Sequence, residues 1–182
     1  MKLLPNALSA ARLALAPWLF YLLWHRQYGL ALIVIFLAGV TDGLDGLLAR
    51  AFGAASKLGA YLDPVADKVL LSGAFLTLAL DGAVAKWLAV LVLGRDALIL
   101  IFACVAFLFT SVRSFPPSFW GKASTTSQIT YIVVLLAHFT GLLGAIFVTL
   151  AEYSAAALTV WSFLHYAWIA RRILRVHQTA KS

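Results

Sequence analysis

The sequence predicts an all-α integral membrane protein with six transmembrane helices and cytoplasmic termini. Of its 182 residues, 63% are hydrophobic and 12% are charged, and the mean hydropathy is +0.95. Soluble domains are about half apolar and a quarter charged. The apolar runs are close to the roughly 20 residues that cross a bilayer, and only short polar or Gly/Pro-rich breaks separate them. We expect one compact membrane domain spanning residues 1–182.

The expected helices are runs of helix formers and bulky apolar residues with polar, glycine or proline boundaries. They cover residues 7–25, 29–52, 64–81, 84–110, 122–144 and 148–172. Residues 1–6 are expected to form a short juxtamembrane piece. Pro116 and Pro117 are expected to stop a helix in the loop 111–121, because proline lacks a backbone N–H.

The basic residues fall mainly at alternate connections, which explains the formal net charge of +7 without nucleic-acid binding. This set comprises Lys2, Arg50, Lys57, Arg113, Lys122, Arg171, Arg172, Arg175 and Lys181. The intervening connections carry only Arg26 and Lys86. By the positive-inside rule, the more basic side is cytoplasmic, and both termini lie there.

Four aspartates lie in one short segment between apolar helices. Asp42 and Asp45 are three residues apart and therefore project from one face of the second expected helix. Asp63 precedes Pro64, which suggests a helix that begins there with Asp63 as its N-cap. Asp67 would follow one turn later. The sequence thus predicts that two pairs of carboxylates come together where the chain reverses.

Such a cluster needs cationic partners inside a membrane protein. Asp42 is more than two turns from the end of its expected helix, where an unpaired carboxylate costs at least several kcal/mol. Arg50 and Lys57 or Lys68 could neutralise part of this charge. Carboxylates without nearby His or Cys ligands favour hard cations, so we expect one or two Mg²⁺ or Mn²⁺ ions. Small neighbours leave room for a phosphate-bearing ligand.

The spacing Asp42-x2-Asp45-Gly46-x2-Ala49-Arg50-x8-Gly59-x3-Asp63-x3-Asp67 resembles the signature of the CDP-alcohol phosphotransferase family at every defined position. The resemblance extends over essentially the whole chain. Its other elements are an entry similar to PNxLSxxR (residues 5–12), the run LDPVADK (62–68) and a GRD element (94–96).

The resemblance implies transfer of a substituted phosphate from a CDP-linked donor to a hydroxyl, with release of CMP. Asp42, Asp45, Asp63 and Asp67 would bind the metal ions, of which two are expected, and Asp67 would also act as general base. The positions that resemble the CDP-lipid-binding elements are Asn6, Gly46, Ala49, Arg50, Ser56 and Gly59. The donor would be CDP-diacylglycerol, and a homodimer is expected.

Two branches of the family fit, and they differ in the acceptor. One makes phosphatidylglycerophosphate from glycerol 3-phosphate, and the other is the CMP-forming cardiolipin synthases, which use phosphatidylglycerol. The glycerol-phosphate branch typically has Arg-Glu and a further arginine two turns later. Here Arg95-Asp96 is followed by an apolar run. The missing arginine and the segment 116–128 favour cardiolipin synthesis, with Arg95 and Lys122 as acceptor-binding candidates.

Arg12 and the chain as a whole also allow other interpretations. Arg12 fits either a lipid headgroup contact or a contact with the CDP lipid. A divalent-ion transporter is the alternative of another class, but no second broken helix and no polar path across the membrane are found. The short chain without an Arg/Ser-rich leader favours a bacterial inner membrane, with the active site on the cytoplasmic side.

Overall fold

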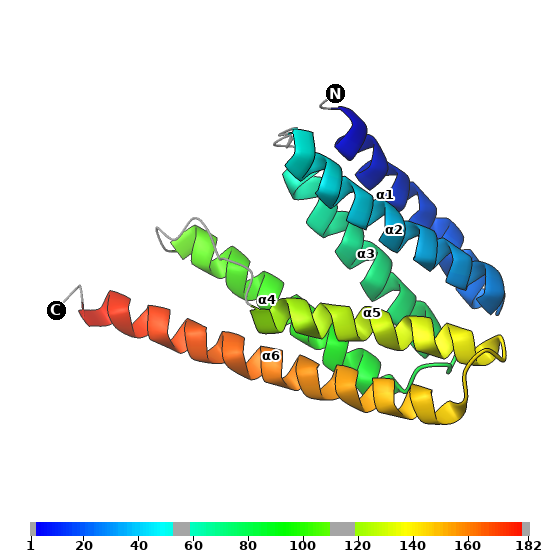
Figure 1. Cartoon of the computed structure of the whole chain (residues 1–182). Helices are drawn as coiled ribbons and strands as arrows, with labels where there is room; N and C mark the ends of the chain where they lie inside the picture. The colour runs from blue at the N-terminus through cyan, green and yellow to red at the C-terminus, as the bar shows by residue number, and fades with distance from the viewer. Residues whose placement is uncertain (1–2, 53–58, 110–118, 180–182) are drawn as a thin grey trace. The chain divides into compact units, whose positions relative to one another are not determined.

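The structure is a computed structural model that describes residues 3–52, 59–109 and 119–179, with side chains over 11–41, 67–101 and 119–168. The described residues form six helices and no strand (Figure 1). These are α1 (Leu3–Trp24), α2 (Tyr28–Phe52), α3 (Gly59–Leu80), α4 (Lys86–Phe109), α5 (Phe119–Phe139) and α6 (Ala145–Thr179). The prediction of six helices is confirmed.

Two expected helix starts are wrong. The helix α1 begins at Leu3, so residues 3–6 of the expected juxtamembrane piece belong to this helix. The helix α3 begins at Gly59, so Asp63 lies inside the helix and is not its N-cap. A proline near a helix start removes few intrahelical hydrogen bonds, which allows a helix to extend upstream of it. Pro116 and Pro117 lie outside the described residues.

The chain packs as two compact units. The first unit contains α1, α2, α3 and the part of α5 from Ile132 onward. The second unit contains α4, the part of α5 up to Tyr131, and α6. Each unit is described by itself below.

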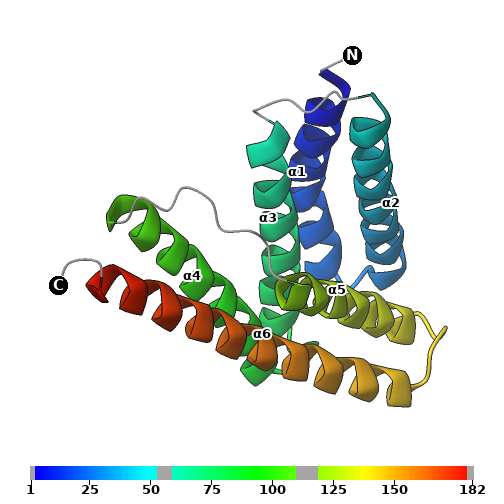
Figure 2. The same cartoon turned by 60° about the vertical axis from the view of Figure 1, so that its left-hand side comes forward.

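In the first unit, α1 packs against both α2 and α3. Figures 1 and 2 show that the start of α1, the end of α2 and the start of α3 lie at one end of this three-helix group. The buried face of α1 carries Arg12, Ala16, Leu19 and Leu23, at the i, i+4, i+7, i+11 spacing of one helix face. The aspartate segment is therefore carried by the helix ends that meet in this unit.

The facing stripe of α3 has the same spacing. It is formed by Leu71, Ala74 and Leu78, and Asp67 lies four residues before the first of them. Close to the middle of this seam, a β-carbon added at Gly73 would overlap the ring of Phe20. Glycine at this position lets the aromatic ring of α1 lie directly on the backbone of α3.

Three helices of the first unit end in the same hydrogen-bonding pattern. The amide of Gln27 donates to Leu22 O, that of Ala83 to Leu78 O, and that of Leu142 to Ala137 O. This pattern is the Schellman motif, which places one residue in the left-handed conformation. That residue is Gly82 (φ 81°), Gly141 (φ 81°) or, in α1, Arg26 (φ 57°). The two glycines explain why α3 and α5 stop where they do.

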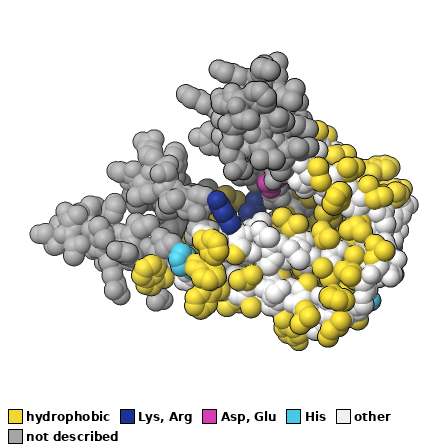
Figure 3. Space-filling model, viewed as in Figure 1, with side chains coloured by type: hydrophobic (Ala, Val, Ile, Leu, Met, Phe, Trp, Pro, Cys, Tyr) yellow, Lys and Arg dark blue, Asp and Glu magenta, His cyan; other side chains and the backbone are white. Residues whose placement is uncertain are grey.

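Large hydrophobic side chains remain exposed on several helices. On α2 they include Ile33 (55% exposed) and Phe36 (68%), and on α6 Leu150 (62%). Hydrophobic side chains cover much of the face seen in Figure 3, and few charged ones interrupt them. Among the described residues, Ala145–Trp168 is long and apolar enough to cross a membrane, and Ala11–Trp24 and Tyr28–Thr41 are shorter apolar stretches.

Candidate metal and substrate site

The four aspartates of the signature lie on two helices of the first unit. Asp42 and Asp45 belong to the C-terminal half of α2, and Asp63 and Asp67 to the N-terminal half of α3. At 1.5 Å per residue, they lie about 15, 10, 6 and 12 Å along their helices from the ends that the loop 53–58 joins. All four therefore lie within about 15 Å of the same end of the unit.

Most of the expected ligand residues have no described side chain. Ser56 lies outside the described residues altogether. For the others only the position in a helix is given; these are Asn6, Asp42, Asp45, Gly46, Ala49, Arg50, Gly59 and Asp63. Their roles stay predictions. Asp67 is the signature aspartate whose side chain is described.

Asp67 is held by an arginine from a different helix. Nη1 of Arg12 on α1 donates to Oδ1 of Asp67 on α3. The Arg12 side chain is 3% exposed, whereas that of Asp67 is 50% exposed. Counting from Leu3, Arg12 lies about 14 Å along α1, which matches the depth of Asp67 on α3. The carboxylate is thus anchored from the buried side and accessible from the other.

Sequence reasoning did not find this partner. It assigned Arg12 to a lipid headgroup or to the CDP lipid, because 55 residues separate it from Asp67. A signal was nevertheless present, since Arg12 is in phase with Ala16, Leu19 and Leu23 on the packed face of α1. A cation at that phase points into the unit rather than toward the headgroups.

Arg95 lies buried in the second unit, with 6% of its surface exposed. Its Nη1 donates to Asp96 Oδ1 (2.7 Å) and its Nη2 to Ser162 Oγ on α6 (2.6 Å). The ring of Tyr166, also on α6, lies 5.8 Å from its Cζ. These groups offset the cost of a cation within an apolar helix. Binding of an acceptor phosphate by Arg95 stays a prediction.

The polar start of α5 divides into two faces. Lys122 and Thr126 are exposed, whereas Ser124 and Gln128 are buried against α6. Nε2 of Gln128 donates to Thr159 Oγ1 of α6 (2.9 Å). The buried polar residues thus join two helices, and binding of an acceptor by the exposed Lys122 stays a prediction.

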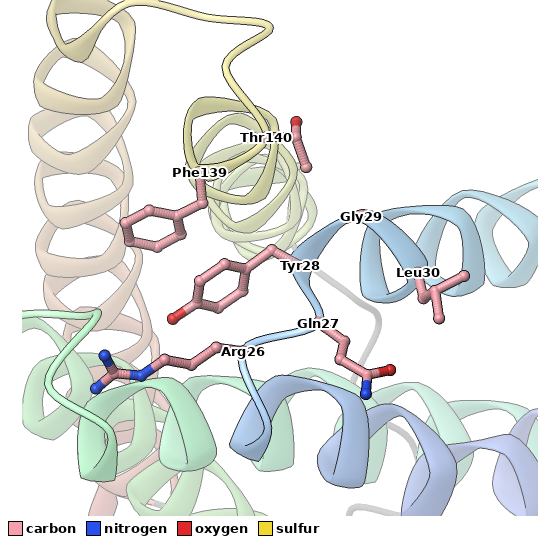
Figure 4. A pocket seen from close by; sticks show the side chains of 7 residues that line it. All are labelled: Arg26, Gln27, Tyr28, Gly29, Leu30, Phe139 and Thr140. Carbon is pink, nitrogen blue, oxygen red and sulfur yellow. The ribbon is translucent and has the colours of Figure 1, made fainter.

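A shallow depression of about 400 Å³ lies at the end of the first unit that carries the turn between α1 and α2. Figure 4 shows its lining, in which Tyr28 stacks on Phe139 with 4.4 Å between ring centroids. Arg26 and Tyr28 both donate to the carboxylate of Asp81. None of the signature aspartates lines this depression.

The donor set suits a hard divalent cation. Four aspartates near the same end of the unit provide oxygen ligands of the kind that Mg²⁺ and Mn²⁺ prefer. Half of the Asp67 side chain is accessible even though it continues a buried stripe, so this carboxylate can reach a bound ion. Among the residues with described side chains, no group of three Asp, Glu, His or Cys residues could hold a metal ion.

The chain belongs to the CDP-alcohol phosphatidyltransferase family, whose model matches residues 2–167. This family generally depends on divalent metal ions and transfers a phosphatidyl group from a CDP-linked donor to an alcohol. The chain is accordingly a phosphatidyltransferase of phospholipid biosynthesis, with CDP-diacylglycerol as its donor.

Its relatives carry names from two acceptor branches. A CDP-diacylglycerol–glycerol-3-phosphate 3-phosphatidyltransferase of Haemophilus influenzae is 32% identical over 174 residues, which cover 92% of this chain and 93% of that protein. A similar enzyme of Pseudomonas fluorescens is 34% identical and covers 91% and 90%. A CMP-forming cardiolipin synthase of Streptomyces coelicolor is 31% identical and covers 97% and 86%.

Proposed function

We propose that this chain transfers the phosphatidyl group of CDP-diacylglycerol to a hydroxyl of phosphatidylglycerol, forming cardiolipin and CMP. The observation that carries the proposal is the half-accessible carboxylate of Asp67 at the depth of the other signature aspartates. In a chain of this family, that is where a metal-bound diphosphate and an acceptor hydroxyl would meet.

Asp42, Asp45, Asp63 and Asp67 would hold one or two Mg²⁺ or Mn²⁺ ions. When bound, the metal neutralises the diphosphate and the leaving CMP. Arg50 has a planar fork of donors suited to the diphosphate, and Gly46, Ala49, Ser56, Gly59 and Asn6 would line the donor site.

Asp67 would accept the proton of the acceptor hydroxyl. The acceptor oxygen then forms a bond to the phosphorus next to diacylglycerol as the bond to the CMP oxygen breaks. The proton resides on Asp67 until solvent removes it. The anchoring by Arg12 keeps this carboxylate in one orientation during the transfer.

The choice of phosphatidylglycerol rests on α4. No Lys or Arg follows Arg95 in this helix, and Arg95 already interacts with Asp96 and Ser162. A dianionic acceptor needs more positive charge than this, whereas a phosphodiester lipid carries only one negative charge. The relatives named for glycerol 3-phosphate make that acceptor the second candidate.

We further propose that all six helices cross the inner membrane of a bacterium as one homodimeric domain, with the aspartates on the cytoplasmic side. The pairing of Arg26 with Asp81 supports this topology. It cancels the charge of one of the two basic residues on the opposite connections, and so increases the charge asymmetry across the bilayer. The exposed apolar side chains would then face lipid.

The test is CMP release by the purified protein in detergent with Mg²⁺ and CDP-diacylglycerol. Phosphatidylglycerol and glycerol 3-phosphate are offered in parallel, and Asp42→Asn is the inactive control. Release with phosphatidylglycerol alone supports cardiolipin synthesis. Release with glycerol 3-phosphate alone would show that this compound is the acceptor and would leave the proposal for the aspartate site unchanged. Absence of release with either acceptor would reject the proposed function.

A further inference from the structure

We propose that Arg12 is a positioning residue for catalysis: it fixes the carboxylate of Asp67 from α1 and so determines how this base meets the acceptor hydroxyl. The inference rests on the proposed function, because it takes Asp67 as the base. It assigns to Arg12 no direct contact with either lipid substrate.

The position of Arg12 in the packing supports this role. It is 2% exposed and occupies the same stripe of α1 as Ala16, Leu19 and Leu23. Its guanidinium lies between helices and reaches across the seam to Asp67. A residue that gripped a lipid headgroup at the membrane surface would keep its charged end accessible.

A purely structural ion pair explains this arrangement less well. Replacing a buried ion pair by apolar residues of similar volume is often neutral or stabilising, so such pairs are weak contributors to stability. Here the burial is also one-sided, with 3% of the Arg12 side chain and 50% of the Asp67 side chain exposed. The arginine bears the desolvation cost, while the carboxylate remains accessible to a ligand.

A second ion pair, just past the C-terminal ends of the same two helices, provides a control. Arg26 and Asp81 follow Arg12 and Asp67 by 14 residues in the sequence and lie in the turns after α1 and α3. Here the arginine side chain is 66% exposed and the aspartate 13%. The accessible partner is therefore the cation, and no carboxylate is presented to a ligand.

The experiment compares Arg12→Met, Arg12→Lys and Arg26→Met with the wild type. CMP release gives kcat and the KM for each substrate, and thermal unfolding in detergent is measured with and without Mg²⁺. A displacement of a reacting group by about 1 Å can cost on the order of 10²-fold in rate. We expect kcat of Arg12→Met to fall by about this factor, with KM for both substrates within about threefold of wild type.

Two further results are expected if Arg12 positions Asp67. Arg12→Lys recovers part of the lost kcat, because a cation returns without the planar fork. The increase in Tm on adding Mg²⁺ shrinks in Arg12→Met and persists in Arg26→Met, which reports on the site without turnover. If Arg12→Met does not fold, a lowered kcat of folded Arg12→Lys at wild-type Tm supports the role equally.

Two outcomes would overturn the inference. In the first, kcat of folded Arg12→Met stays within about threefold of wild type, or, if Arg12→Met does not fold, kcat of Arg12→Lys does so. In the second, KM for CDP-diacylglycerol rises at constant kcat, which assigns Arg12 to donor binding. Wild-type turnover and its loss in Asp67→Asn report separately on the proposed function, so the two ideas can fail independently.

Discussion

Two arginine–aspartate pairs connect α1 and its following turn to α3 and its following turn in the first unit, and they differ in which partner is accessible. The second pair comes 14 residues after the first in both segments, just past the last residue of each helix. Arg12 is buried beside an accessible Asp67, whereas Arg26 is exposed beside a mostly buried Asp81. The same two residue types at the same sequence spacing thus have different roles.

Local structure explains the second pair fully. Arg26 occupies the left-handed position of a Schellman motif that usually carries glycine. Its hydrogen bonds to Asp81, together with the charge of that carboxylate, raise the pKa of the Arg26 guanidinium above its usual value. Tyr28 donates a further hydrogen bond to Asp81 (3.1 Å). This pair connects the turn after α1 to the residue that follows the end of α3.

The first pair has a different setting. Arg12 is in the middle of α1, away from the turn at its end, and Asp67 belongs to the metal-site signature. The difference teaches that an ion pair between packed helices has to be interpreted from the accessibility of each partner. A buried cation beside an accessible carboxylate indicates a site.

The largest expected effect is a difference in catalytic activity between the variants of Asp67 and Asp81. Asp67→Asn removes the proposed base, and CMP release should fall by about 10²–10⁴-fold. Asp81→Asn has the same change in charge and volume at the other end of the seam and should keep kcat within about threefold of wild type. Equal turnover in the two variants would show that accessibility does not distinguish the pairs.

The next largest effect is expected on stability, from the packing of α1 against α3 at Gly73. Gly73→Leu would force a side chain into the ring of Phe20 and should destabilise the protein by about 1–3 kcal/mol. Gly39→Leu on α2 is the control, because nothing lies within 4 Å of a β-carbon there. The change is measured by thermal unfolding in detergent. If Gly73→Leu leaves Tm at the wild-type value, α1 and α3 do not form the seam that both pairs bridge.

The ion pair of Arg26 and Asp81 should affect stability rather than activity. Asp81→Ala removes the acceptor of hydrogen bonds from Arg26 and Tyr28, so Tm should fall by about 2–6 °C. CMP release measured well below Tm should be unchanged. A large loss of turnover in the folded variant would give Asp81 a role that its distance from the aspartate segment does not explain.

The smallest effect is expected at Arg26 itself. Arg26→Gly loses the ion pair but places glycine in the left-handed conformation that it readily adopts. The two changes oppose each other, and Tm should stay within about 2 °C of wild type. A decrease of more than about 5 °C would mean that the exposed pair contributes more than surface ion pairs usually do.

Much of the fold could be predicted from the sequence because a membrane chain separates its helices by conspicuous breaks. All six helices are confirmed, and the glycines at 82 and 141 mark helix ends. The start of α3 could not be predicted, since Asp63-Pro64 has the pattern of an N-terminus while Gly59 begins the helix. Nor does any sequence pattern indicate that Arg26 adopts a left-handed conformation.

The site was partly predictable for a different reason. Spacing alone brought the four aspartates together as candidates, because helical periodicity and a chain reversal are short-range features. The partner of Asp67 depends on how α1 and α3 align, and nearly uniform hydrophobicity hides which face of α1 is buried. In a soluble helix, the polar face would have revealed the phase of Arg12.

The most direct test of phosphatidyl transfer at the aspartate site is metal removal. The purified protein is treated with EDTA, and CMP release from CDP-diacylglycerol is measured with both acceptors while Mg²⁺ is added back. We predict that EDTA abolishes release and that Mg²⁺ restores it in wild type but not in Asp42→Asn. Undiminished release in EDTA would contradict a metal-dependent transfer at these aspartates.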